Sequence, residues 1–338
     1  MATSYDLAVR AGAQAAGRIQ RSLGLRQQIE KTGGAVNIFA AIHELDVPLL
    51  LRPLDGLLGA FLNFPSPGIL VTTQRPLSIQ RFTAAHELGH CILDHQPSLD
   101  DDNILRRMPI NAEPGQDLQE VEADGFAVAF MMPKWLLALH MKRQHWTTPD
   151  LRRPNIVYQL SLRLGVSYEA LCWTLVRYKM IPNKQARELL QTRPRFLKEA
   201  LLAAYTPNNY RGDVWMLTDR DAGARIDGSR NDLFVLKLKE HSNGGYLWNI
   251  EQLRESGFAI VGNEVESLES DSVGDPGFRR VTAQPPEEFR GRLILHETRP
   301  WDETQSLSHI EMDLDFTGPE EEGLSRAERR RRLMLEAA

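Results

Sequence analysis

Hydrophobic positions follow two different periods along the chain. From residue 4 to about residue 30 apolar residues recur at helical spacing, and after Gly33-Gly34 the same pattern returns over residues 36–45. Three short apolar runs broken by Pro and Gly follow, in VPLLLRPL, GLLGAFLNF and GILVTT, and they predict a small sheet beside the helices. From residue 77 to about residue 205 the pattern again predicts mostly helix.

Short segments of alternating polarity predominate from residue 213 to residue 316, as in DLFVLKLKE, RGRLILHET and HIEMDLDF. A period of two turns one face of each strand towards a core, so this half is predicted to be all β. Beyond it, charges occur in blocks. They predict a solvated or frayed helix. The alternative is that the basic run from Arg329 to Arg332 binds an acidic partner.

Composition narrows the classes of protein that these patterns allow. A chain of 338 residues with 42% hydrophobic residues can bury at least one core, and its length suggests about two domains. A net charge of −5 gives no overall basic field for nucleic acid or an anionic membrane. Cys91 and Cys172 lie in apolar helical contexts and are expected to be reduced thiols. Because no apolar leader or 18-residue apolar run occurs, we expect a cytoplasmic protein without membrane insertion.

The segment RFTAAHELGHCILDH places His86 and His90 four residues apart, with Glu87 directly after the first histidine. On an α-helix positions i and i+4 share a face, so both imidazoles can bind one ion, while Glu87 points about 100° round the helix towards a bound water. Zinc bound by neutral imidazoles lowers the pKa of that water to about 7, and a carboxylate takes its proton as the water attacks a carbonyl. The pattern predicts a zincin-type Zn²⁺ site; the alternative is a chance pentapeptide on a structural helix.

A third ligand is predicted in DLQEVEADGFAVAFMMP, whose helical pattern ends at Pro133. Glu120 and Asp124 are an i, i+4 pair and share a face. Glu120 is therefore the candidate zinc ligand, and Asp124 is the candidate hydrogen-bond partner for the far nitrogen of a ligating histidine. Glu122 is expected to point elsewhere. His95 is a further possible ligand, but it lies beyond the same-face spacing and is expected at the surface.

The stretch from about residue 33 to residue 133 resembles the ImmA/IrrE family of zinc metallopeptidases, because both motifs occur in the family's order and at a similar separation. The resemblance implies that His86, His90 and Glu120 match the family's metal ligands and that Glu87 matches its catalytic base. It also implies a soluble protein that cleaves a helix-turn-helix repressor or an antitoxin in a bacterial stress, phage or defence response.

Residues 155–181, NIVYQLSLRLGVSYEALCWTLVRYKMI, predict a helix, a turn and a second helix capped by Ser167. DNA binding is one interpretation of this pattern. However, the second helix offers only Arg177 and Lys179 near its end as base-reading side chains. Packing on the catalytic part or docking of the substrate is therefore the preferred hypothesis, and direct DNA binding is not expected.

In the β half, HSNGGYLWNI, GDPGF and ETRPWDE resemble, in order, the three loops of chagasin-like inhibitors of papain-type cysteine proteases. The resemblance covers about residues 210–316 and implies an immunoglobulin-like sandwich. Tyr246, Trp248, Arg299 and Trp301 are the candidate partner-binding residues, because binding hot spots favour Trp, Tyr and Arg, although aromatic residues of sandwich strands often belong to the core. The first loop has Gly-Gly where the family typically has Thr-Gly, so a recruited recognition module is the alternative to inhibition.

These patterns predict an α+β chain in four parts: a helical zincin-type metallopeptidase domain with a small sheet (1–140), a helical helix-turn-helix-like segment (141–205), a chagasin-like β-sandwich (206–316) and a charged tail (317–338). The predicted function is a zinc-dependent endopeptidase that cuts a protein substrate, with the β part serving recognition or regulation. One alternative is a non-catalytic zinc-containing sensor or binding protein, against which Glu87 argues because a structural site needs no base. The other is an inhibitor of a papain-like cysteine protease.

Overall fold

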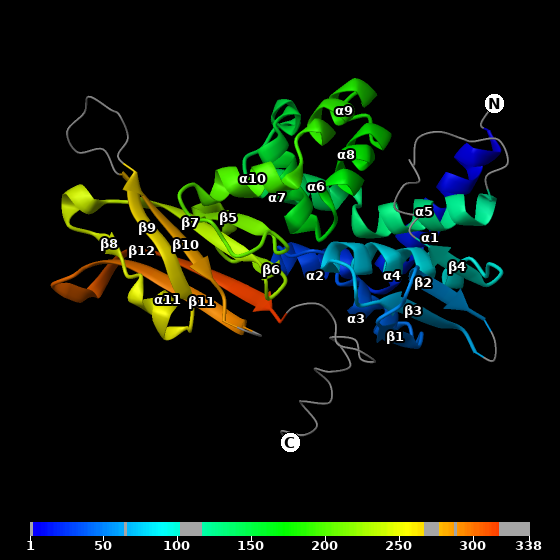
Figure 1. Cartoon of the computed structure of the whole chain (residues 1–338), viewed down its shortest axis with the longest axis horizontal. Helices are drawn as coiled ribbons and strands as arrows, with labels where there is room; N and C mark the ends of the chain where they lie inside the picture. The colour runs from blue at the N-terminus through cyan, green and yellow to red at the C-terminus, as the bar shows by residue number, and fades with distance from the viewer. Residues whose placement is uncertain (1–2, 64–65, 102–116, 267–276, 287–288, 318–338) are drawn as a thin grey trace, which may run out of the picture.

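The computed structural model describes residues 3–63, 66–101, 117–266, 277–286 and 289–317. The predicted charged tail, apart from its first residue, and most of the GDPGF loop lie outside these residues. No helix within the described part is long and apolar enough to cross a membrane. The helical part and the β part lie end to end, with the middle helices beside their junction (Figure 1).

Three helices open the chain: α1 (Ser4–Ser22), α2 (Leu25–Thr32) and α3 (Ile38–Glu44). The helical spacing of apolar residues from residue 4 to about residue 30 is shared by two helices, α1 and α2. Gly24 separates them with a φ of 62°, a left-handed conformation that glycine adopts without the steric cost of a Cβ.

A four-stranded sheet follows, made of β1 (Leu49–Arg52), β2 (Leu57–Leu62), β3 (Gly68–Thr72) and β4 (Ser98–Asp101). The order is β1-β3-β2-β4, with β1 parallel to β3, and β2 antiparallel to both β3 and β4. The apolar runs predicted the first three strands. The fourth was not predicted because SLDD shows no apolar alternation; its pairing with β2 makes it a strand.

Helices α4 (Leu77–Ile92) and α5 (Leu118–Met131) pack against each other, and α5 also packs on α1. The two helices approach closely at Gly89, where an added Cβ would lie 3.1 Å from both Ala123 Cα and Phe126 Cβ. A larger residue at this position would push α5 away by a few tenths of an ångström, so glycine favours this close packing. Helix α5 lies between α1 and α4. Its apolar side chains are buried: Val121, Phe126, Ala127, Phe130 and Met131.

Five helices form the middle of the chain: α6 (Lys134–Arg143), α7 (Pro154–Leu164), α8 (Tyr168–Arg177), α9 (Asn183–Gln191) and α10 (Pro194–Leu202). They lie along one side of the molecule, near the place where the two halves meet (Figure 1). A short 3-10 helix links α6 to α7.

The predicted helix-turn-helix consists of α7 and α8. Gly165 makes the turn with a φ of 69°, and the Ser167 hydroxyl accepts a hydrogen bond from Ala170 N at 3.2 Å, which confirms the predicted cap. Helix α8 buries Leu171, Cys172 and Leu175 among others. This segment therefore packs into the core through α8, as the sequence favoured.

The β half contains two four-stranded sheets, ordered β5-β7-β10-β9 and β6-β12-β11-β8. Phe234 of the first sheet packs against Phe316 of the second with ring centres 6.0 Å apart, so the sheets enclose a shared core. A short helix, α11 (Glu251–Glu255), follows β8. The all-β prediction for this half is confirmed by eight strands: β5 (Val214–Thr218), β6 (Arg225–Asp227), β7 (Leu233–Glu240), β8 (Leu247–Trp248), β9 (Ala259–Glu266), β10 (Gly277–Gln284), β11 (Phe289–Arg299) and β12 (Asp302–Phe316).

A buried polar network joins the two halves where α7 meets β5. The Arg163 guanidinium donates to both carboxylate oxygens of Asp221, at 2.8 and 3.0 Å, and the two side chains are only 3% and 1% exposed. Gln159 Nε2 donates to Val214 O at 2.8 Å, and Val214 N donates to Tyr158 Oη at 3.0 Å. Buried apolar side chains of the helical part and of the β half also belong to one continuous core cluster. The change of secondary structure near residue 205 therefore does not separate two independent cores.

Candidate metal centre and partner-binding loops

The three predicted zinc ligands lie together between α4 and α5. His86 and His90 are fully buried on one face of α4, with their Nε2 atoms 3.0 Å apart. Glu120, in the first turn of α5, places Oε2 3.2 Å from His86 Nε2 and Oε1 3.6 Å from His90 Nε2. One ligand atom from each residue lies within 4.8 Å of the others. The i, i+4 spacing on α4 and the packing of α5 against it produce this convergence.

The chemistry of this ligand set fits a divalent zinc ion. Two imidazoles and one carboxylate form the protein ligand set of many catalytic zinc sites. Burial alone would raise the pKa of Glu120, but its hydrogen bonds with His86 and His90 outweigh burial and hold the pKa of this carboxyl well below its usual range. An ionised carboxylate and two imidazole nitrogens thus face one point. Within the described ranges, no second group of three such ligands converges.

Asp124 lies on the opposite side of the His86 ring from Glu120. Its Oδ1 is 2.9 Å from His86 Nδ1. An ionised carboxylate only accepts hydrogen bonds, so at this distance it favours the tautomer with the proton on Nδ1 and leaves the Nε2 lone pair for a metal. Asp124 thus lies beside the far nitrogen of His86, and its role in orienting this ring stays a prediction.

His95 was expected at the surface, and this prediction was wrong. The side chain is only 5% exposed, with Nδ1 3.0 Å from His90 Nδ1 and Nε2 2.9 Å from Glu122 Oε2. Helix α4 ends at Ile92 and Asp94 has a φ of 55°, so the chain turns and His95 N donates to His90 O at 3.0 Å. Helical spacing does not apply beyond the end of the helix. Glu122, which was expected to point elsewhere, reaches the site through His95.

The candidate base Glu87 is fully buried on α4, between the two histidines in sequence. Its carboxylate faces β2, because a Cβ added at Gly59 would lie 2.7 Å from Glu87 Oε1. Gly59 thus leaves the room that this carboxylate occupies. Gly59 was not among the predicted site residues, although a glycine inside an apolar strand is a signal of close approach.

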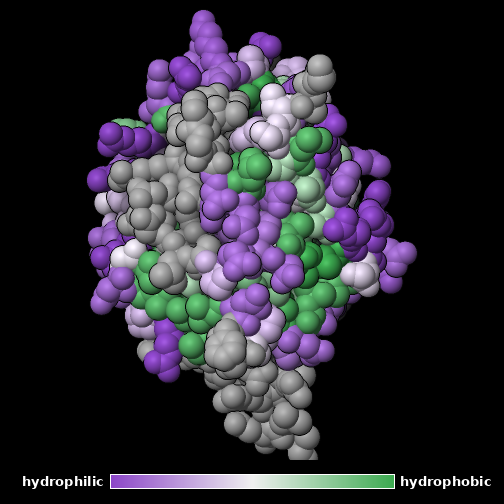
Figure 2. Space-filling view, turned by 90° about the vertical axis from the view of Figure 1, so that its right-hand side faces the viewer, coloured by the Kyte–Doolittle hydropathy of each residue, from purple (hydrophilic) through white to green (hydrophobic). Residues whose placement is uncertain are grey.

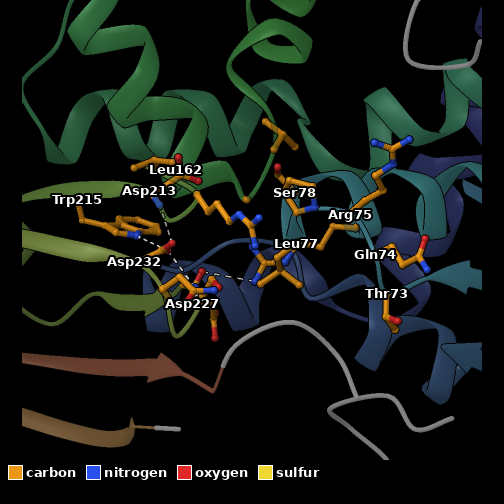
Figure 3. Close-up of a pocket in the computed structure, with 18 residues that line it drawn as sticks. Thr73, Gln74, Arg75, Leu77, Ser78, Leu162, Asp213, Trp215, Asp227 and Asp232 are labelled. Atoms are coloured by element: carbon orange, nitrogen blue, oxygen red, sulfur yellow. Dashed lines mark hydrogen bonds between the residues drawn. The ribbon is translucent and has the colours of Figure 1, made fainter. Parts of the chain in front are cut away.

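A separate cavity of about 590 Å³ lies where α4 begins, between the two halves (Figure 3). Asp232 is held there by the chain's own donors, with Trp215 Nε1 at 3.0 Å from Oδ2 and Asp213 N at 2.8 Å from Oδ1. Burial and the neighbouring Asp213 raise the pKa of Asp232 to about 6. Arg81 Nη2 donates across the junction to Asp227 O at 3.5 Å. The Arg81 contact connects the ligand-bearing helix α4 to the β half.

The first and third predicted loops of the β half meet at one end. Arg299 stacks over the Tyr246 ring with Cζ 4.5 Å from its centre, and Arg299 Nε donates to Gly244 O at 3.3 Å. Trp301 is 73% exposed and lies against Gly245, where a Cβ would be 2.6 Å from Trp301 Cη2. Tyr246, Arg299 and Trp301 form one surface, called the loop cluster below. The predicted middle loop lies largely outside the described residues.

Trp248, the fourth candidate for partner binding, belongs to the core, so its predicted place at a binding surface was wrong. It is 8% exposed, and its indole Nε1 donates to Lys239 O at 2.8 Å. Its backbone N donates to Glu240 Oε2 at 3.1 Å. Trp248 lies where β8 pairs with β11 and packs in the core of the β half, as many aromatic residues of sandwich strands do.

Two family models match separate regions of the chain, one containing the candidate metal ligands and one containing the loop cluster. Residues 43–176 match the sequence model of the IrrE N-terminal-like domain of peptidase family M78. Residues 228–315 match the model of the chagasin family of peptidase inhibitors, I42. Both resemblances found in the sequence are therefore confirmed. The chain combines a region similar to metallopeptidases with a region similar to peptidase inhibitors.

Individual relatives each match about a third of the chain. Amoebiasin-2 of Entamoeba histolytica is 26% identical over 108 residues, which is 31% of this chain and 87% of that protein. A crystal structure of the cysteine protease inhibitor EhICP2 from Entamoeba histolytica shares 21% identity, covers 30% of this chain and 95% of its own, and gives a TM-score of 0.27. The solution structure of amebosin shares 14% identity with the same coverage and a TM-score of 0.23.

Proposed function

We propose that the chain is a zinc-dependent endopeptidase, with zinc held by His86, His90 and Glu120 and with Glu87 as the general base. The observation that carries this proposal is the convergence of the three ligand atoms within 4.8 Å. The match of residues 43–176 to a peptidase family supports the same class of activity.

Each residue of this centre has a distinct role in the proposed reaction. Zinc, when bound, polarises the substrate carbonyl and makes water acidic enough to act as a nucleophile near neutral pH. Glu87 takes the proton of the attacking water and delivers it to the leaving amine. Asp124 orients His86, since its Oδ1 lies 2.9 Å from His86 Nδ1. Burial of His86, Glu87 and His90 keeps these groups out of bulk water.

A purely structural zinc site fits these observations less well. Structural sites are usually closed by four protein ligands, whereas three ligand atoms converge here among the described residues. A three-ligand set leaves a coordination position for the reacting groups. The buried carboxylate of Glu87 next to His86 has no role in a structural site.

The proposed substrate is a protein, and the proposed substrate class is a helix-turn-helix repressor or an antitoxin. Hydrophobic surface is interspersed with hydrophilic surface at the end of the molecule that carries the small sheet and α5 (Figure 2). Leu62 at the end of β2 and Leu118 at the start of α5 are 45% and 46% exposed. Single exposed leucines are ordinary on protein surfaces, so the proposal of a protein substrate rests on the match of residues 43–176 to a peptidase family.

The test of this function is to label new N-termini in a cell lysate incubated with the zinc-loaded chain. We expect a small set of cleaved bonds that disappears when a chelator removes the metal and returns when zinc is restored, because peptide hydrolysis requires the metal. The same set of cleavages in the chelated sample would contradict a zinc peptidase.

Inhibition of a papain-type cysteine protease is the second candidate function, and the loop cluster favours it. Residues 228–315 match an inhibitor family, and Trp301 offers a largely exposed indole beside Arg299 and Tyr246. This function is compatible with the first, because the loop cluster lies on the β half and the metal ligands lie on α4 and α5.

Trp301→Ala tests the second candidate. If the loop cluster binds papain, the substitution should weaken inhibition by at least about 10-fold, since a hot-spot aromatic costs about 2 kcal/mol or more on truncation. Zinc content should stay unchanged. Phe196→Ala on α10 is the matched control, because Phe196 is a 60% exposed aromatic outside the loop cluster. Absence of papain inhibition by the full chain at micromolar concentration would reject this candidate.

A further inference from the structure

His90 contacts polar groups through both of its ring nitrogens. Nε2 lies on the metal side, 3.6 Å from Glu120 Oε1, and Nδ1 lies 3.0 Å from Nδ1 of His95. The other nitrogen of His95 is 2.9 Å from Glu122 Oε2. The result is a line of contacts from Glu122 through His95 to His90. A buried imidazole needs a partner at each nitrogen, and His95 has one at each.

The direction of these hydrogen bonds follows from the chemistry of the two ends. An ionised Glu122 can only accept, so His95 Nε2 carries the proton of that bond. His90 can bind a metal through Nε2 only if that nitrogen has no proton, so the proton of a neutral His90 is on Nδ1. His90 Nδ1–H therefore donates to His95 Nδ1. Glu122 and His90 therefore require the same tautomer of a neutral His95, which donates through Nε2 to Glu122 and accepts through Nδ1 from His90.

We propose that His95 and Glu122 are positioning residues that hold His90 in the tautomer and orientation in which Nε2 binds the metal. The proposal rests on the proposed metal site. It adds a second set of contacts to the one that Asp124 makes with His86, whose Nδ1 lies 2.9 Å from Asp124 Oδ1. Each ligand histidine thus has its own partner at the nitrogen that faces away from the metal.

Helix α5 supplies the acidic residue of each contact. Glu120 reaches the metal face directly, and Asp124, one turn further along, reaches His86. Glu122 lies about 200° round the helix from Glu120 and cannot share that face. It contributes because the chain after α4 turns back at Asp94 and brings the His95 ring between Glu122 and His90.

The test measures zinc affinity by competition with a chromophoric chelator in the purified full chain. His95→Phe keeps a ring of similar size but removes both nitrogens, and it should weaken zinc binding by about 10- to 100-fold. Glu122→Leu alone should weaken it less. The double variant should be no weaker than His95→Phe, because Glu122 acts only through His95.

The matched control replaces a histidine and a glutamate that are exposed on α3, His43→Phe with Glu44→Leu, and its zinc affinity should equal that of wild type. A spectroscopic readout separates positioning from packing. In the zinc-loaded wild type, the imidazole ¹⁵N spectrum should show His95 protonated at Nε2 and unprotonated at Nδ1. His95 protonated at Nδ1 would reverse the hydrogen bond to His90 and overturn the proposal.

The outcomes distinguish this inference from the function on which it rests. If wild type binds no zinc, the metal site itself fails, and the positioning role fails with it. If wild type binds one zinc that His86→Ala removes, but His95→Phe binds zinc as tightly as wild type, only the positioning role is overturned. Additive losses for His95→Phe and Glu122→Leu would also overturn it, because they would show that the two side chains act independently.

Discussion

Purified His86→Ala is expected to lose zinc. The substitution removes one of three protein ligands and leaves His90 and Glu120 as an incomplete set. Because changes to groups that only orient a ligand cost about 10- to 100-fold in metal affinity, loss of a ligand should cost more than about 100-fold. Metal content after dialysis and chelator competition would measure this loss.

His43→Ala is the control for His86→Ala, since His43 is an exposed histidine on α3. It should retain one zinc per chain. Unfolding of metal-free wild type and metal-free His86→Ala should be compared as well, so that loss of zinc is not confused with loss of the fold. A His86→Ala variant that keeps one tightly bound zinc would contradict the proposed ligand set.

Arg163→Ala should lower the free energy of unfolding by about 3–5 kcal/mol, because it leaves the buried Asp221 carboxylate without its charged partner. Asp221 is 1% exposed and would keep hydrogen bonds from Gln144 Nε2 and Thr218 N, but no guanidinium. The pair joins α7 to the β half, so the loss should affect both halves together. Denaturant unfolding followed by circular dichroism would measure it.

Lys184→Ala provides the comparison for Arg163→Ala. Lys184 pairs with Glu188 at 3.9 Å on α9, where the side chains are 90% and 48% exposed. Such an exposed pair contributes at most about 1 kcal/mol. If Arg163→Ala destabilised the chain no more than Lys184→Ala does, the buried pair would not hold the two halves together.

The pairings within each helix of the candidate metal centre were predictable because helical spacing determines them, whereas the packing of α5 on α4 brings the two pairs together. An i, i+4 pair shares a face, which places His86 beside His90 and Glu120 in line with Asp124. The β half was predictable for a similar reason, since alternation with a period of two is specific to strands with one buried face. These local periodicities survive in the folded chain because packing reinforces them.

Features that depend on chain reversals or on tertiary partners were not predictable in this way. His95 lies after the end of α4, where the left-handed conformation of Asp94 redirects the chain, and no helical spacing describes that turn. Strand β4 exists through its pairing with β2. Trp248 was placed at a binding surface on the basis of its loop motif, but pairing of β8 with β11 turns it into the core.

The core shared by the two halves was also not predicted from the sequence. The secondary structure changes from helix to strand near residue 205. Arg163 and Gln159 on α7 nevertheless form hydrogen bonds with Asp221 and Val214, which follow this change. A boundary in secondary structure marks a boundary between cores only when few contacts cross it. Here the crossing contacts are buried and charged.

The ratio of cleavage rates between wild type and Glu87→Gln, at equal zinc content and on the same protein substrate, tests the central claim most directly. The substitution keeps the size of the side chain but replaces the carboxylate with an amide, which cannot take a proton from water. The proposed mechanism predicts that zinc is retained and that cleavage falls by about 100-fold or more, as is typical for the loss of a positioned general base. Equal cleavage rates for the two proteins would contradict a zinc endopeptidase that uses Glu87.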